Sequence, residues 1–100
     1  MNSKSRTEII LLLKPGLAVR KFFYYEIIRL VEEASRFLKE NYPDRKCTLQ
    51  FLCGNEFWSQ HSDGDCRLAG HVMVFLVENE LVPFKIADYS CRTPNRYRLK

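Results

Sequence analysis

The sequence is poor in glycine and proline and has no low-complexity tract or internal repeat. It holds four Gly and four Pro in 100 residues, while 46% of its residues are hydrophobic and 13% are aromatic. This composition excludes an intrinsically disordered chain. The length predicts one small globular domain over residues 1–100, and sharing apolar surface with a second copy would help so small a core.

A membrane-spanning or signal-like apolar run is also missing. The run near the start, Ile9 to Leu13, is five residues long, whereas a signal peptide needs about 7–15 apolar residues and a membrane span about 18. We therefore expect a soluble, cytoplasmic protein with no membrane partner. Cysteines in such a protein are mostly reduced and behave as small buried hydrophobes. The four cysteines are Cys47, Cys53, Cys66 and Cys91.

The paired spacings of structural zinc sites are absent. His61, Cys66 and His71 lie five positions apart, and Cys47 and Cys53 lie six apart. Zinc ligands typically follow C-x2–4-C and H-x3–5-H spacings, and two positions five apart on a helix point in different directions. We predict no metal site.

Catalytic motifs are absent too: there is no phosphate-binding loop, no G-x-S-x-G and no G-x-G-x-x-G. The carboxylates of Glu56, Asp63 and Asp65 could in principle hold Mg²⁺ for nuclease chemistry. Asp63 and Asp65 are better explained as a turn former and a helix N-cap. We expect a non-enzymatic protein without a cofactor.

Positive charge is concentrated at the C-terminal end. Residues 81–100 hold five of the 16 Lys and Arg residues and one of the 12 Asp and Glu residues, so residues 1–80 hold eleven of each sign. The formal net charge of +4 therefore belongs to the last twenty residues. Such a localised charge indicates either a solvated chain end or a surface that meets phosphate.

Two elements are expected in the N-terminal half. The apolar run over residues 7–13 predicts a short strand within an arm over residues 1–16, closed by Pro15-Gly16. Residues 18–42 predict a long helix that Pro43 ends. Its apolar side chains form two adjacent stripes, Phe23, Ile27, Leu30, Ala34 and Phe37 in one and Tyr24, Ile28, Val31 and Leu38 in the other. Its solvent side carries Arg29, Glu33, Arg36 and Glu40.

Two apolar stripes are wider than one small core needs. Either the N-terminal strand covers the second stripe, or that stripe meets its counterpart in a homodimer. The candidate dimer interface is Tyr24, Ile28, Val31 and Leu38 of the long helix, with the strand at 7–13 as a second candidate contact. The four consecutive aromatics at 22–25 face four directions on a helix, so they indicate core or interface positions and not a stacking platform for single-stranded nucleic acid.

The C-terminal half predicts a strand, two helices and a hairpin. Alternating apolar residues over 46–52 indicate a short strand, and residues 55–60 give one or two helical turns. Asp65 is the expected N-cap of a helix over 66–80. Residues 82–99 predict a β-hairpin with one apolar and one basic face. The apolar face has Phe84, Ile86, Tyr97 and Leu99.

This order of elements resembles a winged helix-turn-helix domain with a core over residues 17–100. Small modules of this kind, familiar from uncharacterised bacterial and mobile-element proteins, have a Trp-bearing helix, a tight turn, a helix and a wing ending in "YRL". The matching positions are Trp58, Gly70, Val74, Leu76-Val77-Glu78, Leu81, Pro83 and Tyr97-Arg98-Leu99. The resemblance implies an α+β fold in which helix 66–80 recognises DNA and the hairpin is the wing.

The resemblance also implies a nucleic-acid-binding face. Arg67, Gly70 and His71 would lie outward on the recognition helix, where the first turns meet base edges in the major groove of double-stranded DNA. The basic residues of the wing would neutralise phosphates; these are Arg92, Arg96, Arg98 and Lys100. The implied function is that of a small transcriptional regulator.

Two alternatives stay open at this stage. Val74 on the outward face, with Glu78 and Glu80 nearby, suits a protein partner better than a base edge. These residues favour the alternative of a homodimeric protein-interaction module or mobile-element adaptor with no nucleic-acid role. A βαβαββ arrangement, with strand 7–13 beside 46–52, would favour that alternative and leave the basic tail as a plain sheet edge.

Overall fold

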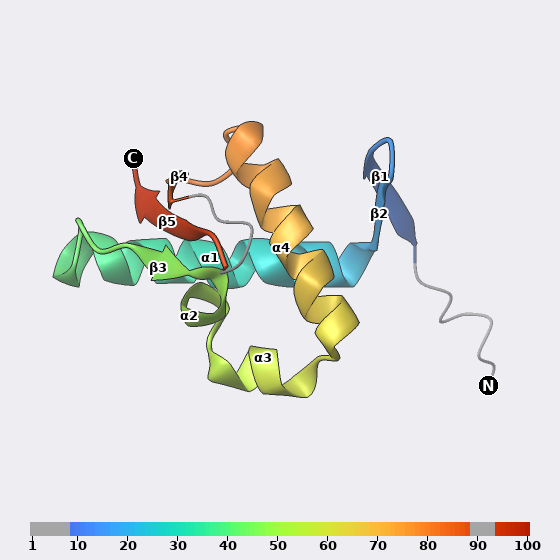
Figure 1. The fold of residues 1–100 in the computed structure, drawn as a ribbon, viewed down its shortest axis with the longest axis horizontal. Helices are drawn as coiled ribbons and strands as arrows, with labels where there is room; N and C mark the ends of the chain where they lie inside the picture. Colours follow the sequence, from blue (N-terminus) through green and yellow to red (C-terminus); the bar gives the residue numbers. More distant parts are fainter. Residues whose placement is uncertain (1–8, 89–93) are drawn as a thin grey trace.

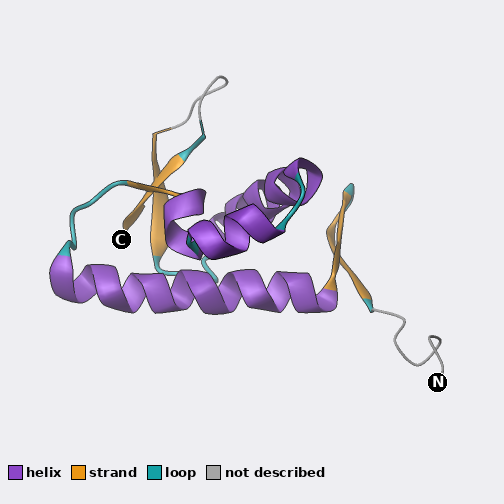
Figure 2. Ribbon diagram, turned by 90° about the horizontal axis from the view of Figure 1, so that it is seen from below, coloured by secondary structure: helices purple, strands orange, loops and turns teal. Residues whose placement is uncertain are grey.

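The computed structural model describes residues 9–88 and 94–100, which form an α+β fold built on one long helix (Figure 1). The elements in chain order are β1 (Ile10–Lys14), β2 (Leu17–Arg20), α1 (Lys21–Asn41), β3 (Cys47–Thr48), α2 (Leu49–Cys53), α3 (Asn55–Gln60), α4 (Asp63–Glu78), β4 (Phe84–Asp88) and β5 (Arg96–Leu99). Figure 2 shows α1 along one side of the fold, with α2, α3, α4 and the C-terminal strands on the other side. None of the described helices is long and apolar enough to cross a membrane.

The N-terminal strand is half of a hairpin. β1 pairs antiparallel with β2, with Leu11 opposite Val19, and the turn between them contains Gly16 at a φ of 85°, which favours glycine. The sequence-based start of the helix at residue 18 is therefore wrong. Leu17 and Val19 are buried while Ala18 between them is exposed, and this period of two belongs to a strand.

The predicted strand over residues 46–52 is mostly helix. Only Cys47 and Thr48 are in a strand, β3, and α2 follows at once. The Thr48 hydroxyl accepts a hydrogen bond from the Phe51 N–H at 3.3 Å and so caps α2. Leu49, Leu52 and Cys53 are buried, and these spacings of three and four place them on one helical face.

α4 begins earlier than the sequence suggested. Its N-cap is Ser62, whose hydroxyl accepts a hydrogen bond from the Asp65 N–H at 3.1 Å. The prediction of Asp65 as N-cap is wrong, because its carboxylate instead accepts a hydrogen bond from Arg20 of β2 at 3.1 Å. This ion pair ties the N-terminal hairpin to the first turn of α4.

The C-terminal hairpin is confirmed. β4 and β5 pair antiparallel, with Phe84 opposite Leu99 and Ile86 opposite Tyr97. β3 pairs with the other edge of β5, which gives a three-stranded sheet in the order β3-β5-β4. The βαβαββ alternative is wrong, because β1 pairs with β2 and not with β3.

The buried face of α1 runs between the two predicted stripes. It consists of Phe23, Tyr24, Ile27, Val31, Ser35 and Leu38. Of the four candidate dimer residues, Tyr24, Val31 and Leu38 are 9%, 0% and 1% exposed, and Ile28 packs partly buried against the same core. These side chains pack against the chain's own core, and a homodimer stays a prediction. Phe37, expected in the core, is 52% exposed.

Candidate nucleic-acid interface

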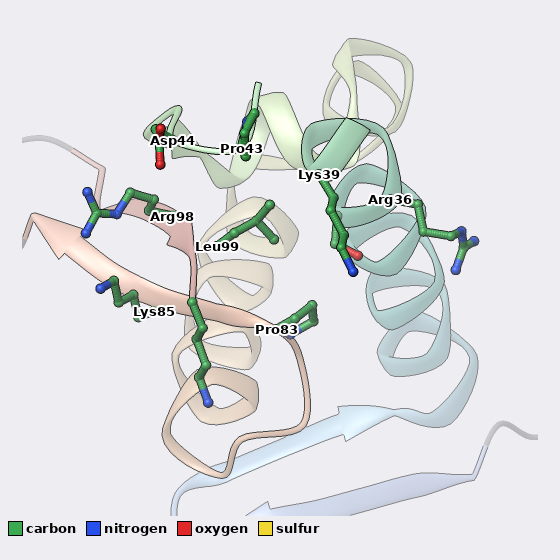
Figure 3. A pocket seen from close by; sticks show the side chains of 10 residues that line it. Arg36, Lys39, Pro43, Asp44, Pro83, Lys85, Arg98 and Leu99 are labelled. Carbon is green, nitrogen blue, oxygen red and sulfur yellow. The ribbon is translucent and has the colours of Figure 1, made fainter. Parts of the chain in front are cut away.

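A basic hollow of about 600 Å³ lies between the C-terminal half of α1 and the base of the C-terminal hairpin (Figure 3). We call it the basic hollow. Its lining residues are Ser35, Arg36, Lys39, Pro43, Asp44, Pro83, Lys85, Arg98, Leu99 and Lys100. Five of them are cationic and one, Asp44, is acidic. Figure 3 shows Lys39 projecting from α1 and Lys85 and Arg98 projecting from the hairpin, with Leu99 between them.

Most of these cations form no ion pair with another residue that the structure describes. Of the five, Lys100 alone takes part in an ion pair with another described residue, Glu80, at a distance of 3.4 Å between Nζ and Oε1. The Glu80 side chain is 80% exposed, and an ion pair so open to solvent adds little stability. The basic hollow therefore presents positive charge that the described residues leave largely uncompensated.

The hairpin places two of these cations directly opposite each other. Lys85 of β4 and Arg98 of β5 are cross-strand partners, and like charges at such positions destabilise a sheet. Arg36 and Lys39 lie three residues apart on α1, so their side chains are neighbours on the helix surface. An anion bound between the two elements would relieve both repulsions.

A second hollow of about 610 Å³ lies along the first half of α4, and we call it the α4 hollow. Its lining residues are Thr48, Leu49, Gln50, Trp58, Cys66, Arg67, Gly70, His71, Val74, Pro94, Asn95 and Tyr97. Arg67 and His71 are exposed on this side of the helix. Guanidinium, imidazole and amide groups there can form hydrogen bonds with the edges of bases or with backbone groups of a partner.

Gly70 is the one lining residue of the α4 hollow without a side chain. A Cβ atom built at this position would meet no heavy atom within 4 Å, so packing inside the chain does not require a glycine. Glycine in a helix interior costs about 1 kcal/mol relative to alanine. The open space above Gly70 allows a ligand to approach the backbone of α4 closely.

The predicted nucleic-acid-binding residues divide between the two hollows. Arg67, Gly70 and His71 are together in the α4 hollow, whereas Arg98 and Lys100 line the basic hollow. Arg96 lines neither hollow; its cross-strand partners are Asp88 and Thr48. Arg92 lies outside the described residues.

Sequence reasoning missed three of the five cations in the basic hollow. The sequence pattern predicts Arg36 on the solvent side of the long helix, does not distinguish Lys39, and includes Lys85 only within the net charge of residues 81–100. These three cations come together only because of where α1 ends relative to the hairpin. No local sequence pattern encodes this packing of α1 against the hairpin. The excess charge in residues 81–100 was the one signal that pointed to the region.

Two carboxylates stand near the α4 hollow. Asp63 and Asp65 lie in the first turn of α4, where the helix dipole favours negative charge. Arg20 partly compensates Asp65 through their ion pair and also lies 5.0 Å above the Phe23 ring. A polyanion approaching this end of α4 would thus be repelled mainly by Asp63.

The thiols of the described residues are not activated for nucleophilic chemistry. Burial raises the pKa of Cys53 to about 12, with further increases from Glu26 and Cys66. Burial and the nearby carboxylates of Asp63 and Asp65 raise the pKa of Cys66. Because the thiolate is the reactive form, these cysteines behave as packing residues. The described residues also contain no group of three or more His, Cys, Asp or Glu side chains that could hold a metal ion.

His61 has a structural role. Its Nδ1 lies 2.8 Å from the Phe57 carbonyl oxygen, and its ring stacks on Phe57 with the ring centroids 4.1 Å apart. The ring is also 5.5 Å from that of Phe23. These contacts connect the end of α3 to the start of α1.

In comparisons with known proteins, no family model, no curated protein and no solved structure matches the chain.

Proposed function

We propose that this chain is a winged helix-turn-helix domain that binds double-stranded DNA as a small, non-enzymatic regulator. The order α1, β3, α2–α3, α4, β4, β5 and the sheet order β3-β5-β4 support the fold part of the proposal. In it, α4 is the recognition helix and the β4–β5 hairpin is the wing.

The basic hollow is the observation that carries the binding part of the proposal. Five cations from two elements line it, and four of them have no ion pair with another described residue. DNA presents a regular row of phosphates, and cations that neutralise them supply affinity without sequence information. Phosphate is thus the ligand that best matches the charge of the basic hollow.

The α4 hollow supplies the part of the interface that would read bases. Strand β5 contributes to both hollows, Tyr97 to the α4 hollow and Arg98 and Leu99 to the basic hollow. A duplex that follows β5 would therefore contact both. In this arrangement Arg67 and His71 face base edges, and Lys39, Lys85 and Arg98 contact the backbone.

A titration with a fluorescently labelled duplex tests the proposal. Changing Lys39 and Arg98 together to Gln should weaken binding by at least about tenfold, because two phosphate contacts are lost. The matched control changes Arg29 and Lys46 to Gln; these cations lie outside both hollows and pair with Glu33 and Asp88. Equal losses in the two double variants, or no binding by the wild type, would refute the proposed function.

A protein-interaction module is the second candidate, and one surface favours it. Phe37, Tyr42 and Phe51 are each at least 44% exposed, and the guanidinium of Arg45 lies 5.7 Å from the Tyr42 ring and 4.9 Å from the Phe51 ring. Aromatic and arginine side chains are enriched at protein interfaces. This candidate predicts that Phe51→Ala, and not Arg98→Gln, abolishes binding of the physiological partner.

A further inference from the structure

Within residues 9–88 and 94–100, the N-terminal hairpin leaves one edge of β1 without a partner strand. The sheet that contains β1 has only two strands, and no described residue pairs with its other edge. Figures 1 and 2 both place this hairpin at the N-terminal end of α1, away from the three-stranded sheet. Proteins usually protect such edges with charge, proline or a covering element, whereas residues 9–13 are all Ile or Leu.

The free edge has backbone groups available for pairing. The Lys21 N–H donates to the Ile9 carbonyl at 2.8 Å, so Ile9 has its carbonyl toward the β2 side. Hydrogen-bonded positions alternate along an antiparallel pair. The N–H and C=O groups of Ile10 and Leu12 therefore point away from β2 and toward the open edge.

Exposed apolar side chains surround this edge. Ile10 and Leu12 are 58% and 71% exposed, and residues two apart in a strand share a face. The Ile9 carbonyl accepts a hydrogen bond from Lys21, the residue before Phe22. Ile9 is 57% exposed and Phe22 is 69% exposed. Tyr25, 52% exposed, follows Phe22 by three residues and so lies beside it on α1. Ile10 and Leu12 thus form an apolar patch on one face of β1, and Phe22 and Tyr25 form a second exposed apolar surface at the start of α1.

We propose that a second copy of this chain covers the free edge of β1, so that two β1 strands pair antiparallel across a two-fold axis and join two hairpins into one four-stranded sheet. An antiparallel pair of identical strands is self-complementary, as an isologous interface requires. The exposed apolar side chains of β1 and of the start of α1 together expose on the order of 500 Å², which is comparable with the roughly 800 Å² that each partner contributes to a stable complex.

The charge pattern selects the register of this pairing. With the two-fold axis at Leu11, Ile10 of each chain lies opposite Leu12 of the other, and both residues have outward backbone groups. Residues 9–13 then pair only with uncharged residues, and Lys14 lies beyond them. With the axis at Leu12, Ile10 would face Lys14, which places a charge against an apolar side chain.

Sedimentation equilibrium of the full chain tests the interface. The wild type should dimerise, and Leu12→Lys should raise the dissociation constant of the dimer by at least about tenfold, because each copy loses a buried leucine and gains a charge. Leu81→Lys is the matched control: Leu81 is 50% exposed and lies between α4 and β4. It should leave dimerisation unchanged, and circular dichroism should show that both variants are folded.

Cross-linking tests the register independently of affinity. Ile10→Cys and Leu12→Cys chains should form little disulfide-linked dimer when oxidised separately, but should cross-link when mixed, because position 10 of one copy then faces position 12 of the other within disulfide range.

A wild-type chain that stays monomeric up to about 1 mM overturns the proposal. So does a dimer that Leu12→Lys leaves intact, or a mixture of the two cysteine variants that cross-links no better than either alone. All of these measurements are made without DNA, so their outcome is independent of whether the chain binds DNA.

Discussion

At the scale of single residues, Gly70 connects the packing of α4 to its proposed contact with DNA. A Cβ atom there has open space around it, so packing among the described residues does not require a glycine at this position. Gly70→Ala should raise the free energy of unfolding by about 0.5–1 kcal/mol. It should also weaken DNA binding, because the added methyl group keeps the duplex away from the helix backbone.

Urea unfolding and a duplex titration on the same Gly70→Ala sample measure both effects. Higher stability together with unchanged affinity would show that DNA does not approach α4 at this position. Ala69→Gly is a useful comparison, because Ala69 is fully buried and its loss should affect stability alone.

Cys53 gives a prediction about pH. Burial raises the pKa of its thiol from 9.0 to about 12. Below pH 9 the thiol is protonated in both the folded and the unfolded chain, so its contribution to stability is fully present. As the pH rises from 9 toward 12, the unfolded chain loses this proton first, and the free energy of unfolding falls by up to about 1.4 kcal/mol per pH unit.

Comparison of wild type with Cys53→Ala isolates this effect from other groups that titrate in the same range. Between about pH 8 and pH 10.5 the wild type should lose on the order of 2 kcal/mol more than the variant, measured by urea unfolding. Parallel pH profiles would mean that the Cys53 thiol is more accessible to water than the structure indicates.

At the scale of elements, sequence patterns identified what was long or strongly alternating. The long helix, the helix that carries Gly70 and the alternation of Phe84, Ile86, Tyr97 and Leu99 were all predictable, because each has enough residues to establish its period. The predicted strand at 46–52 failed because seven residues fit both periods. The Thr48 hydroxyl accepts a hydrogen bond from the Phe51 N–H and so stabilises the first turn of a helix over these residues.

Part of the candidate site was predictable for a similar reason. Arg67, Gly70 and His71 share a face because they lie on one helix, and the sequence reports that directly. The convergence of Lys39 on Arg98 depends on how α1 packs against a hairpin more than forty residues later, and a single sequence does not encode that contact in any local pattern.

The C-terminal end of α4 is strained at Glu80. Its φ is 56°, in the left-handed region, where a non-glycine residue costs roughly 1–2 kcal/mol. The Glu80 N–H donates to the Val77 carbonyl and the Leu81 N–H to the Leu76 carbonyl, a helix-ending motif that usually has glycine at this position. The Glu80 carboxylate also forms an ion pair with Lys100 of the basic hollow.

Replacing Glu80 separates these two roles. Glu80→Gly should stabilise the fold by about 1 kcal/mol, because it relieves the left-handed backbone, and should strengthen DNA binding by releasing Lys100. Glu80→Gln should strengthen binding by a similar amount without the gain in stability. Thermal unfolding and duplex titration of both variants check this; weaker DNA binding in either would contradict the assignment of Lys100 to the phosphate contact.

At the scale of the whole molecule, the basic hollow and the proposed dimer surface around β1 lie at opposite ends of α1. The basic hollow adjoins the C-terminal half of this helix, and the exposed apolar patch of the N-terminal hairpin adjoins its start. Two copies joined at their β1 edges would thus carry their basic hollows on the outside of the dimer. Contact with a partner copy and contact with a polyanion would then not compete for the same surface.

The salt dependence of duplex binding tests the central claim, that the basic hollow neutralises DNA phosphates. The logarithm of the binding constant should fall with the logarithm of salt concentration with a slope of about −4, since four to five cations each contribute about −0.9. Changing Lys39 and Arg98 to Gln should make the slope shallower by about 1.8, and the Arg29 and Lys46 control should leave it unchanged. A wild-type slope near zero, or the same slope in both double variants, would contradict the claim.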